Sequence, residues 1–422
     1  MGSYTESCPV SVDTINNLRE EGTLTSEQAL SHLRVIDVSH HIAGPYCTKL
    51  LAELGAEVIK IERPDRGDPA RRIGPFPNDD PHPEKSALFL HLNTNKKSIT
   101  LNLKSEPGKE LFKELVRRAD IVVENFRPEV MPNLGLGYEV LEKINPKLVM
   151  TSISNFGQYG PYRDYKATDI VEYALSGFMY MMGNPDQEPL KHVGYQAQYQ
   201  AGIYAFVGSL AAVYLAEETG EGQYVDISIQ EVMTSIDEYG IPSWVLQHHI
   251  YKRRGNIGGV HPWGIYPCRN GYVGLALAML PHWRSFVVML GIEGLQDKKF
   301  EDTNYRMLHR DEVDAYMLPW LLEHDKEEVY IEGQRRGIPT FYVRNAENLH
   351  NARQYRERGF WVELDHPMTG KLLYPGAPGI MSETPLQMSS APLLGQHNEE
   401  VYCQRLGLSE KDLVKMRQMS VI

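Results

Sequence analysis

The stretch MTSISNFGQYGPYRDYKATDIVEYALSG, residues 150–177, predicts a strand, a glycine-rich loop and a helix in direct succession. Gly157 and Gly160 interrupt the regular pattern after the strand. The helix is expected to begin at Thr168–Asp169, because apolar residues follow at helical spacing. Asp169 therefore has two interpretations: a helix cap that accepts backbone N–H bonds, or a nucleophile whose charge the helix N-terminus stabilises.

The composition limits the classes of protein to which the chain can belong. Its 422 residues exceed one ordinary domain, and its net charge of −12 argues against a nucleic-acid partner. Cys8, Cys47, Cys268 and Cys403 form neither a C-x-x-C pair nor a zinc spacing, so we expect reduced thiols in a cytoplasmic protein. No apolar run approaches the length of a membrane span, and the N-terminus lacks a secretory core, so we expect no membrane partner.

The first half of the chain predicts a parallel sheet. Residues 33–38 and 57–62 read as buried strands on either side of a helix, which is a βαβ unit. The turn after the first strand, residues 39–45, reads SHHIAGP instead of G-x-G-x-x-G. The dinucleotide fingerprint is therefore missing, and a nicotinamide-dependent oxidoreductase loses its main support.

Further strands are predicted at 98–103, 120–124, 148–150 and 224–229, with helices between them. Polar loops follow these strands and share one rim of the sheet, where open α/β sheets bind ligands. The apolar helix at 201–216 is too short and too rich in Gly and Ala for a membrane span, so we expect it to be buried.

The pattern changes near residue 230. A hairpin is predicted around the turn Arg269-Asn270-Gly271, and charged helical segments follow it. The expected domains are an N-terminal appendage at 1–32, a large domain at 33–229, a smaller α+β domain at 230–336 and a return to the large domain at 337–422.

Several segments, taken in order, resemble the class III coenzyme A transferases, the CaiB/BaiF group. They run from about Leu33 to Leu408 and read VIDVSHHIAGPYCTKLLAELGAEVIKIERPDRGD, NTNKKSITLNLKSEPGKELFKELVRRADIVVENFRPEVMPNLGLGYEVLEKINPKLV, SISNFGQYGPYRDYKATDIVEYALSG, TGEGQYVDISIQE and APLLGQHNEEVYCQRLGL. The resemblance implies an α/β fold with a Rossmann-like large domain built from both chain ends, a smaller inserted α+β domain, and two subunits interlocked like chain links.

The resemblance also implies a set of site residues. It makes Asp169 the catalytic carboxylate, and it makes Gly258 and Gly259 part of a mobile loop over the site, although an ordinary linker turn explains these glycines equally well. The residues expected to contact coenzyme A are His40, Ala43, Arg63, Lys96, Lys97, Asn125, Phe126 and Arg127. Lys96 and Lys97 are open to a second interpretation as a solvated pair, and Asn133 stands where some relatives have an Arg. His40 and His41 have no further ligand at a suitable spacing, so no metal is expected.

The implied reaction moves CoA from an acyl-CoA donor, with succinyl-CoA as the donor by family habit, to another carboxylic acid. A carboxylate nucleophile forms a mixed anhydride, then an aspartyl-CoA thioester on Asp169, and the acceptor acid reverses these steps. The thioester energy is kept only if water is excluded. Coenzyme A is thus substrate and carrier, and the expected assembly is a homodimer or a heteromer with a related subunit.

Two alternatives remain. A non-catalytic or partner-dependent subunit of a heteromeric CoA-transferase fits the same resemblance. An acyl-CoA racemase is less well supported, because Thr168 replaces the His of those enzymes and no Asp or Glu occurs between Glu188 and Glu217.

Overall fold

The computed structural model describes residues 28–256 and 258–422, so most of the predicted N-terminal appendage lies outside the described residues. The described chain divides into two compact units. Unit 1 takes residues 28–178, 191–238 and 354–422, and unit 2 takes 179–190 and 239–353.

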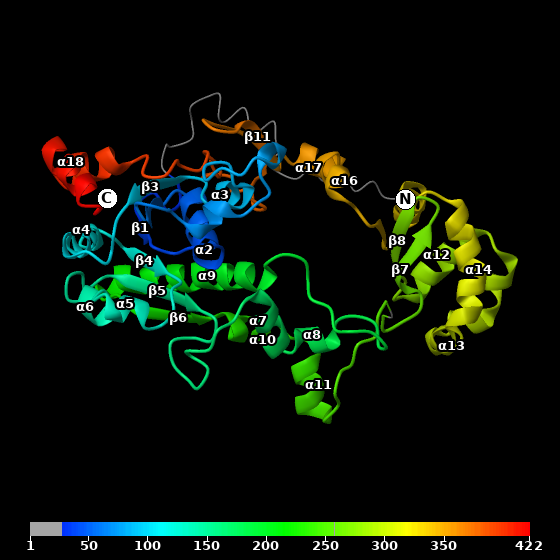
Figure 1. Cartoon of the computed structure of the whole chain (residues 1–422). Helices are drawn as coiled ribbons and strands as arrows, with labels where there is room; N and C mark the ends of the chain where they lie inside the picture. Colours follow the sequence, from blue (N-terminus) through cyan, green and yellow to red (C-terminus); the bar gives the residue numbers. More distant parts are fainter. Residues whose placement is uncertain (1–27, 257) are drawn as a thin grey trace. The chain divides into compact units, whose positions relative to one another are not determined.

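Unit 1 is built on a six-stranded parallel sheet (Figure 1). Its strands are β1 (Arg34–Asp37), β2 (Glu57–Glu62), β3 (Lys96–Thr100), β4 (Ile121–Glu124), β5 (Val149–Ser154) and β6 (Tyr224–Ser228). They lie in the order β3-β2-β1-β4-β5-β6, with every neighbouring pair parallel. This is the order of a Rossmann-type sheet, in which ligands bind where the order reverses, between the carboxyl ends of β1 and β4. The predicted α/β fold is confirmed.

The sheet buries both of its faces, as parallel sheets do. Alternate strand residues, among them Ile36, Ile59, Val122 and Met150, form one core with the helices on one face. The helices of that face are α4 (Glu106–Val116), α5 (Val130–Asn133) and α6 (Tyr138–Leu141). The other face carries α2 (Ala43–Glu53) and α9 (Gln196–Thr219), which pack against each other.

The C-terminal segment completes the core of unit 1. Two helices of this segment, the π-helix Glu400–Arg405 and α18 (Glu410–Gln418), lie near β3 at the edge of the sheet (Figure 1). Tyr402 is fully buried and donates its hydroxyl to the carbonyl of Thr100 at 2.7 Å. The last residues, Val421 and Ile422, are also buried in this core.

Smaller elements complete unit 1. A hairpin of β10 (Trp361–His366) and β11 (Gly370–Pro375) packs near α3 (Ala87–Leu92). The remaining helices of this unit or at its boundaries are α7 (Asp169–Leu175), α8 (Phe178–Met181), α10 (Ile229–Ser235) and α17 (Arg353–Glu357).

Helix α9 differs from its prediction. It runs from Gln196 to Thr219 and alone among the described helices is long and apolar enough to cross a membrane by length and composition. Its Ala- and Gly-rich side packs on α2 and the sheet, where a Cβ at Gly202 would lie 2.7 Å from the carbonyl oxygen of Ala43. Its other side is not buried as expected, because Val207 and Tyr214 are 57% and 68% exposed.

Unit 2 contains an antiparallel three-stranded sheet with helices against it. The strands are β7 (Trp263–Cys268), β8 (Gly271–Ala276) and β9 (Thr340–Tyr342). The helices are α11 (Gly240–Gln247), α12 (Leu280–Leu290), α13 (Thr303–Leu308), α14 (Arg310–Glu323), α15 (Lys326–Arg335) and α16 (Ala346–His350). The hairpin predicted around Arg269-Asn270-Gly271 is confirmed.

The boundaries along the chain differ from those predicted at 230 and 337. Residues 230–238 stay in unit 1, because α10 packs against α9. Residues 337–353 were expected to return to the large domain, but β9 pairs with β8, which keeps them in unit 2.

Candidate active site

Two loops meet at the point where the strand order of the sheet reverses. His40 follows β1 and Asn125 follows β4. The Asn125 amide bonds the backbone of His40 in both directions: its Oδ1 accepts from the His40 N–H at 2.8 Å, and its Nδ2 donates to the His40 carbonyl at 2.7 Å. Asn125, predicted to contact coenzyme A, therefore holds the turn that carries His40.

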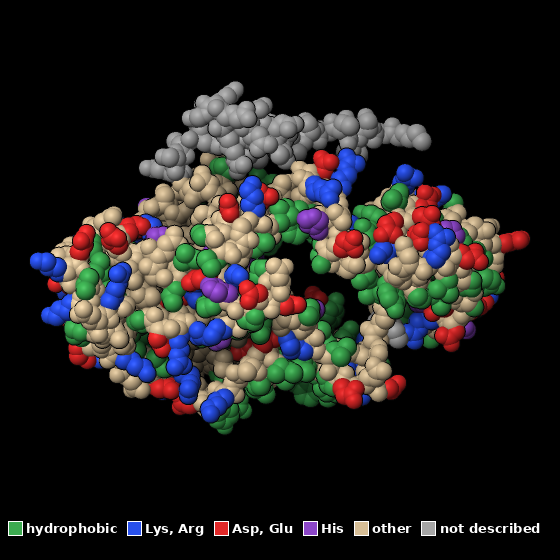
Figure 2. Space-filling view, turned by 45° about the horizontal axis from the view of Figure 1, so that its top comes forward, with side chains coloured by type: hydrophobic (Ala, Val, Ile, Leu, Met, Phe, Trp, Pro, Cys, Tyr) green, Lys and Arg blue, Asp and Glu red, His purple; other side chains and the backbone are tan. Residues whose placement is uncertain are grey.

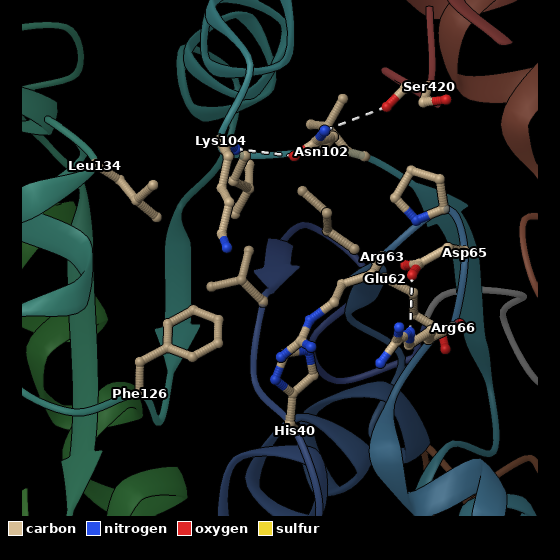
Figure 3. A pocket seen from close by; sticks show the side chains of 15 residues that line it. His40, Glu62, Arg63, Asp65, Arg66, Asn102, Lys104, Phe126, Leu134 and Ser420 are labelled. Atoms are coloured by element: carbon tan, nitrogen blue, oxygen red, sulfur yellow. Dashed lines mark hydrogen bonds and ion pairs between the residues drawn. The ribbon is translucent and has the colours of Figure 1, made fainter. Parts of the chain in front are cut away.

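A cavity of about 560 Å³ opens beside this junction (Figure 3). Its lining comes from the loops after β1, β2, β3 and β4 and from the C-terminal Ser420. Three of the predicted contact residues meet here, His40, Arg63 and Phe126, and the Phe126 ring stands edge-on to the His40 ring at 5.2 Å. The volume lies within the range of small-molecule sites.

The cavity combines cations with apolar walls. Arg63, Arg66 and Lys104 line it, together with side chains such as Ile61 and Leu134. Arg66 pairs with its neighbour Asp65, whereas no carboxylate in the described chain pairs with Arg63 or Lys104. Lys and Arg side chains are elsewhere interspersed with Asp and Glu over the visible surface (Figure 2). Unpaired cations beside apolar surface suit a ligand that carries both phosphate and a ring system.

The His40 ring contributes no positive charge to this cavity. Burial lowers the pKa of His40 to about 4, although Asp68 nearby acts in the opposite direction. The imidazole is therefore neutral at pH 7 and offers an aromatic edge and one hydrogen-bond acceptor.

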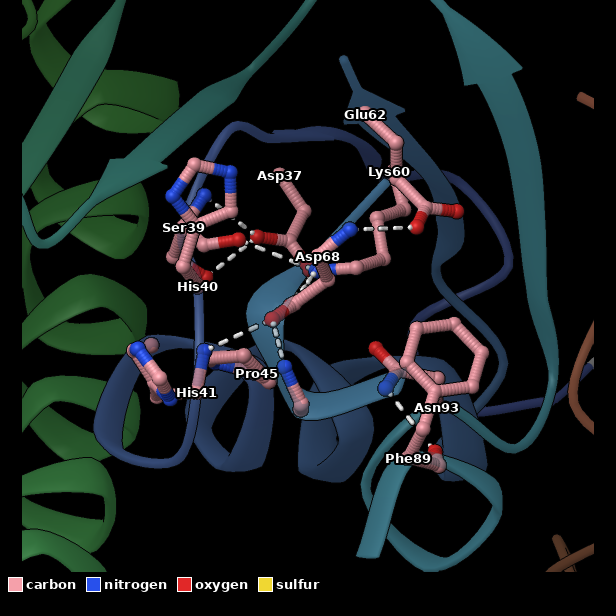
Figure 4. Close-up of polar contacts among 12 residues, drawn as sticks. Asp37, Ser39, His40, His41, Pro45, Lys60, Glu62, Asp68, Phe89 and Asn93 are labelled. Carbon is pink, nitrogen blue, oxygen red and sulfur yellow. Dashed lines mark hydrogen bonds and ion pairs between the residues drawn. The ribbon is translucent and has the colours of Figure 1, made fainter. Parts of the chain in front are cut away.

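Beneath the turn of residues 39–45 lies a network of buried charges (Figure 4). Lys60 on β2 pairs with Asp68 at 2.9 Å and donates to the Ser39 carbonyl at 2.9 Å. Lys96 on β3 donates to Asp37 at 3.0 Å and to the Pro45 carbonyl at 2.8 Å. All four charged side chains are fully buried.

The network determines the ionisation of its members. Burial opposes the charge of Asp37, but Lys60 and Lys96 hold its pKa well below the usual range. Burial lowers the pKa of Lys96 to about 8, and Asp37 works against that change. Buried charges are stable only when they are paired, so these side chains constrain one another.

The structure separates other predicted contact residues from this cavity. Lys96 donates all three of its N–H groups inside the protein, the third to Asn93 at 2.9 Å. Lys97 pairs with Glu57 and Glu400 at 2.8 and 2.6 Å. Ala43, the first residue of α2, is fully buried, and Arg127 does not line the cavity. Lys96 and Lys97 are not a solvated pair, because Lys96 is buried, and neither residue lines the cavity.

Asp169 lies at a second place in unit 1, where α7 meets the start of α9. It is the first residue of α7 after the cap position Thr168, so it does not cap its own helix. Its Oδ1 accepts from the N–H of Ala197 in the first turn of α9 at 3.1 Å, and its Oδ2 pairs with Lys191 at 2.6 Å. Both oxygens of this buried carboxylate are thus engaged.

A second carboxyl group shares this junction. Glu172, one turn further along α7, is fully buried, and the Gln198 amide donates to its two oxygens at 3.2 and 3.0 Å. Asn155, in the amide orientation that satisfies both its neighbours, donates to Glu172 Oε1 at 2.8 Å. Burial, with a smaller contribution from Asp169, raises the pKa of Glu172 to about 7.

The predicted loop glycines belong to unit 2. Gly258 donates its N–H to the Trp263 carbonyl at 3.1 Å, and Gly259 follows it before β7. Their role as a cover of the site stays a prediction. Among residues 28–256 and 258–422, no group of three or more His, Cys, Asp or Glu side chains is arranged to hold a metal ion.

Sequence reasoning did not single out Arg66 and Lys104, which line the cavity, or Glu172, which lies one turn after Asp169. Lys104 reaches the cavity because the chain turns back after β3, which local pattern does not reveal. For Glu172 a signal was present, since two acidic residues stand one turn apart at the start of α7.

Comparison with known proteins identifies the family. Residues 30–398 match the model of CoA-transferase family III. The chain is 34% identical over 397 residues to a succinyl-CoA–D-citramalate CoA-transferase of Chloroflexus aurantiacus, covering 93% of this chain and 98% of that protein. It is 33% identical to the BbsE subunit of succinyl-CoA:(R)-benzylsuccinate CoA-transferase of Thauera aromatica, covering 89% and 93%. A crystal structure of a CaiB/BaiF family protein from Brucella suis superposes with a TM-score of 0.82 at 27% identity, covering 90% of this chain and all of that one. The resemblance inferred from the motifs is confirmed.

We expect Lys60→Met to destabilise unit 1 by about 3–5 kcal/mol, because it leaves Asp37 and Asp68 buried without a shared cation. Urea denaturation followed by circular dichroism measures the loss. The matched control is Lys371→Met, whose pair with Glu363 is exposed to solvent and contributes little to stability. Equal losses in the two variants would contradict the importance of the network.

Proposed function

The chain belongs to CoA-transferase family III, and from this premise we propose that it moves CoA from succinyl-CoA to a second carboxylic acid through a covalent carboxylate intermediate. Family members act on acyl-CoA thioesters and carboxylic acids. The observation that carries the proposal is the cationic cavity at the reversal point of the sheet, in the same unit as two buried carboxyl groups of α7 that bond to the first turn of α9. Succinyl-CoA is proposed as donor because relatives are named for it.

The nucleotide end of coenzyme A is assigned to the cavity. Its phosphates need cations, which Arg63 and Lys104 offer without a competing carboxylate in the described chain. Its adenine needs apolar and aromatic surface, which Phe126 and the neutral His40 ring provide. The Asn125 bonds to the His40 backbone keep this surface in place before the ligand arrives.

The covalent step is assigned to the junction of α7 and α9. The sequence resemblance selects Asp169 as the carboxylate that forms the anhydride and then the aspartyl-CoA thioester. Its burial supports this role, because water would hydrolyse either intermediate. The N-terminus of α9, a 24-residue helix, adds a favourable potential for a negative charge.

A partner-dependent subunit is the second candidate function. Both oxygens of Asp169 are already engaged, by Lys191 and by the Ala197 N–H, which weakens the case for this carboxylate as a free nucleophile. One of the relatives, BbsE, is itself named as a subunit. In this version the chain binds CoA, and a related subunit supplies the reacting carboxylate.

We also propose that the chain associates with a second copy of itself through the outer face of α9. Ile203, Val207 and Tyr214 lie on that face at 38%, 57% and 68% exposure. Exposed apolar residues along one helix face favour contact with another protein surface. The proposed occupant is a second copy of this chain.

The proposed reaction is tested by mixing the purified chain with succinyl-CoA and a panel of carboxylic acids, and following new acyl-CoA by liquid chromatography and mass spectrometry. We expect exchange with ping-pong kinetics, because a covalent intermediate separates the two half-reactions. CoA binding without any exchange would overturn the self-sufficient enzyme and support the partner-dependent subunit.

We expect Arg63→Gln and Lys104→Gln each to raise the Kd for CoA by roughly 10- to 100-fold, the effect of losing a charge-assisted hydrogen bond. Isothermal titration with CoA and with 3′-dephospho-CoA shows which cation serves the 3′-phosphate, because that variant no longer distinguishes the two ligands. The control is Arg117→Gln, because the Arg117 side chain is exposed at the end of α4 and does not line the cavity. Unchanged affinity in both cavity variants would place the nucleotide elsewhere.

Val207→Asp is expected to weaken self-association at least about tenfold, because it places a charge in an apolar contact. Light scattering over a concentration series measures the molecular mass. Val414→Asp makes the same change at a residue 52% exposed on α18 and should have no effect. A wild-type chain that stays monomeric throughout would contradict the proposed surface.

A further inference from the structure

The carboxylate of Asp169 pairs with one ammonium group in the described part of the chain. Lys191 Nζ donates to Asp169 Oδ2 at 2.6 Å, and no other Lys or Arg of that part pairs with this carboxylate. The N–H of Ala197 holds the other oxygen at 3.1 Å. One oxygen of Asp169 is therefore bonded to the end of a long side chain, whereas the other is bonded to the backbone of a helix.

The ammonium group of Lys191 lies on the solvent side of this pair. The side chain of Lys191 is 22% exposed, whereas that of Asp169 is 6% exposed. Lys191 also donates to the Gly194 carbonyl at 2.5 Å, and its Nζ lies 5.4 Å from the centre of the Tyr173 ring, at a distance typical of cation–π contact. An anion that arrives from solvent therefore meets the ammonium group before it meets Asp169.

The proposed transfer moves one negative charge and keeps its amount constant. An Asp169 oxygen attacks the acyl carbonyl of the donor, the C–S bond breaks, and CoA leaves as thiolate. The thiolate attacks Asp169 Cγ, the C–O bond of the anhydride at that carbon breaks, and the donor acid leaves as carboxylate. Asp169 is then a neutral thioester, and the released acid carries the charge. The acceptor carboxylate brings the charge back when it takes CoA by the same two exchanges in reverse.

This movement of charge leaves Lys191 without a carboxylate partner while the thioester exists. The substrate carboxylate has the complementary need, because an anion that leaves water for a protein site is costly without a cation. The two groups also meet in space, since an oxygen of the acid is covalently joined to Asp169 in the anhydride. The ammonium group that pairs with Asp169 is therefore within reach of the acid that enters or leaves.

We propose that Lys191 is a catalytic residue that binds the substrate carboxylate, and that Asp169 and this carboxylate occupy its ammonium group in turn. The inference rests on the proposed CoA transfer and deepens it by naming the group that recognises the acid. In the resting chain Asp169 holds the place of the substrate. The ligand is a free carboxylate, because an amide or an ester brings no charge to the ammonium group.

The two bonds of Asp169 suit this exchange. When Lys191 turns to a substrate carboxylate, Oδ2 loses its partner and becomes free to attack. Oδ1 keeps the N–H of Ala197 in the first turn of α9, so the carboxylate keeps its orientation. Until the acid arrives, the pair neutralises a buried charge that would otherwise destabilise the junction.

The first test is isothermal titration of succinate, the acid that succinyl-CoA releases, into the full chain. Asp169→Asn frees Lys191 and keeps an oxygen for the Ala197 N–H, so we expect it to bind succinate at least about tenfold more tightly than the wild type, the effect of one charge-assisted hydrogen bond. Adding Lys191→Met should remove this gain, whereas adding Lys191→Arg should keep most of it. Succinamide, the neutral analogue, should show no gain in any variant.

The matched control is Asp164→Asn, which opens an exposed pair with Arg163 at 3.4 Å in the loop before α7 and should leave the Kd for succinate unchanged. No gain in Asp169→Asn, or a gain that survives the addition of Lys191→Met, would overturn the role of Lys191. Exchange of CoA by the wild-type chain would then still support the proposed transfer. A gain that depends on Lys191, in a chain that exchanges no CoA, would support the carboxylate site and overturn the transfer.

A second test separates binding of the acid from a structural role at the start of α9. In the exchange assay, Lys191→Met is expected to raise KM for the acceptor acid at least about tenfold and to leave the Kd for CoA unchanged, because Lys191 does not line the cavity. Lys191→Arg should restore most of the KM. Equal losses of acid and CoA affinity in Lys191→Met, without rescue by Arg, would contradict the proposal. This readout does not use Asp169→Asn, so it also decides the question if that variant fails to fold.

Discussion

The pairing of buried charges beneath the carboxyl ends of β1, β2 and β3 is the constraint on which the cavity depends. Lys60 and Lys96 reach from two strands to the backbone of the turn that follows a third, and Asp37 and Asp68 neutralise them. None of the four can move into solvent without leaving an unpaired charge in the interior, which costs several kcal/mol. The turn is thereby fixed in a backbone shape that includes His41 at a φ of 62°, unusual for a residue with a side chain, with its N–H held by Asp68.

Part of the site was predictable from sequence. The alternation of apolar strands with helices predicted the parallel sheet and placed its ligand edge at the loops after the strands, whereas His40, Arg63 and Phe126 were chosen from the family resemblance. The direction in which a lysine points was not predictable. Lys96 and Lys97 are adjacent on β3, so they point to opposite sides, and one is buried in the charge network while the other joins Glu57 and Glu400. Lysines are rarely buried, and the partners that make it favourable here are distant in the chain.

Helix α9 is a second case in which the sequence did not predict which side chains are buried. Its sequence reads as uniformly apolar, so the pattern alone assigned it to the interior. The packed side is instead set by small residues such as Gly202, which let α9 approach the start of α2, and the larger side chains face outward.

The division of the two units also follows from contacts that the sequence does not show. Strand β9 stays with β8 because its three residues complete an antiparallel sheet, although the Gly and Pro before them read as a domain boundary.

The junction of α7 and α9 shows why a helix start alone does not identify a nucleophile. Asp169 has the position that the motif suggests, yet its charge is used to cap one helix and to pair with one lysine. A reacting carboxylate must be shielded from water and still be less stabilised than its transition state, so a tight ion pair in the ground state works against it. The proposed role of Asp169 therefore requires that its pair with Lys191 opens before the carboxylate attacks, while the N–H of Ala197 can stay in place.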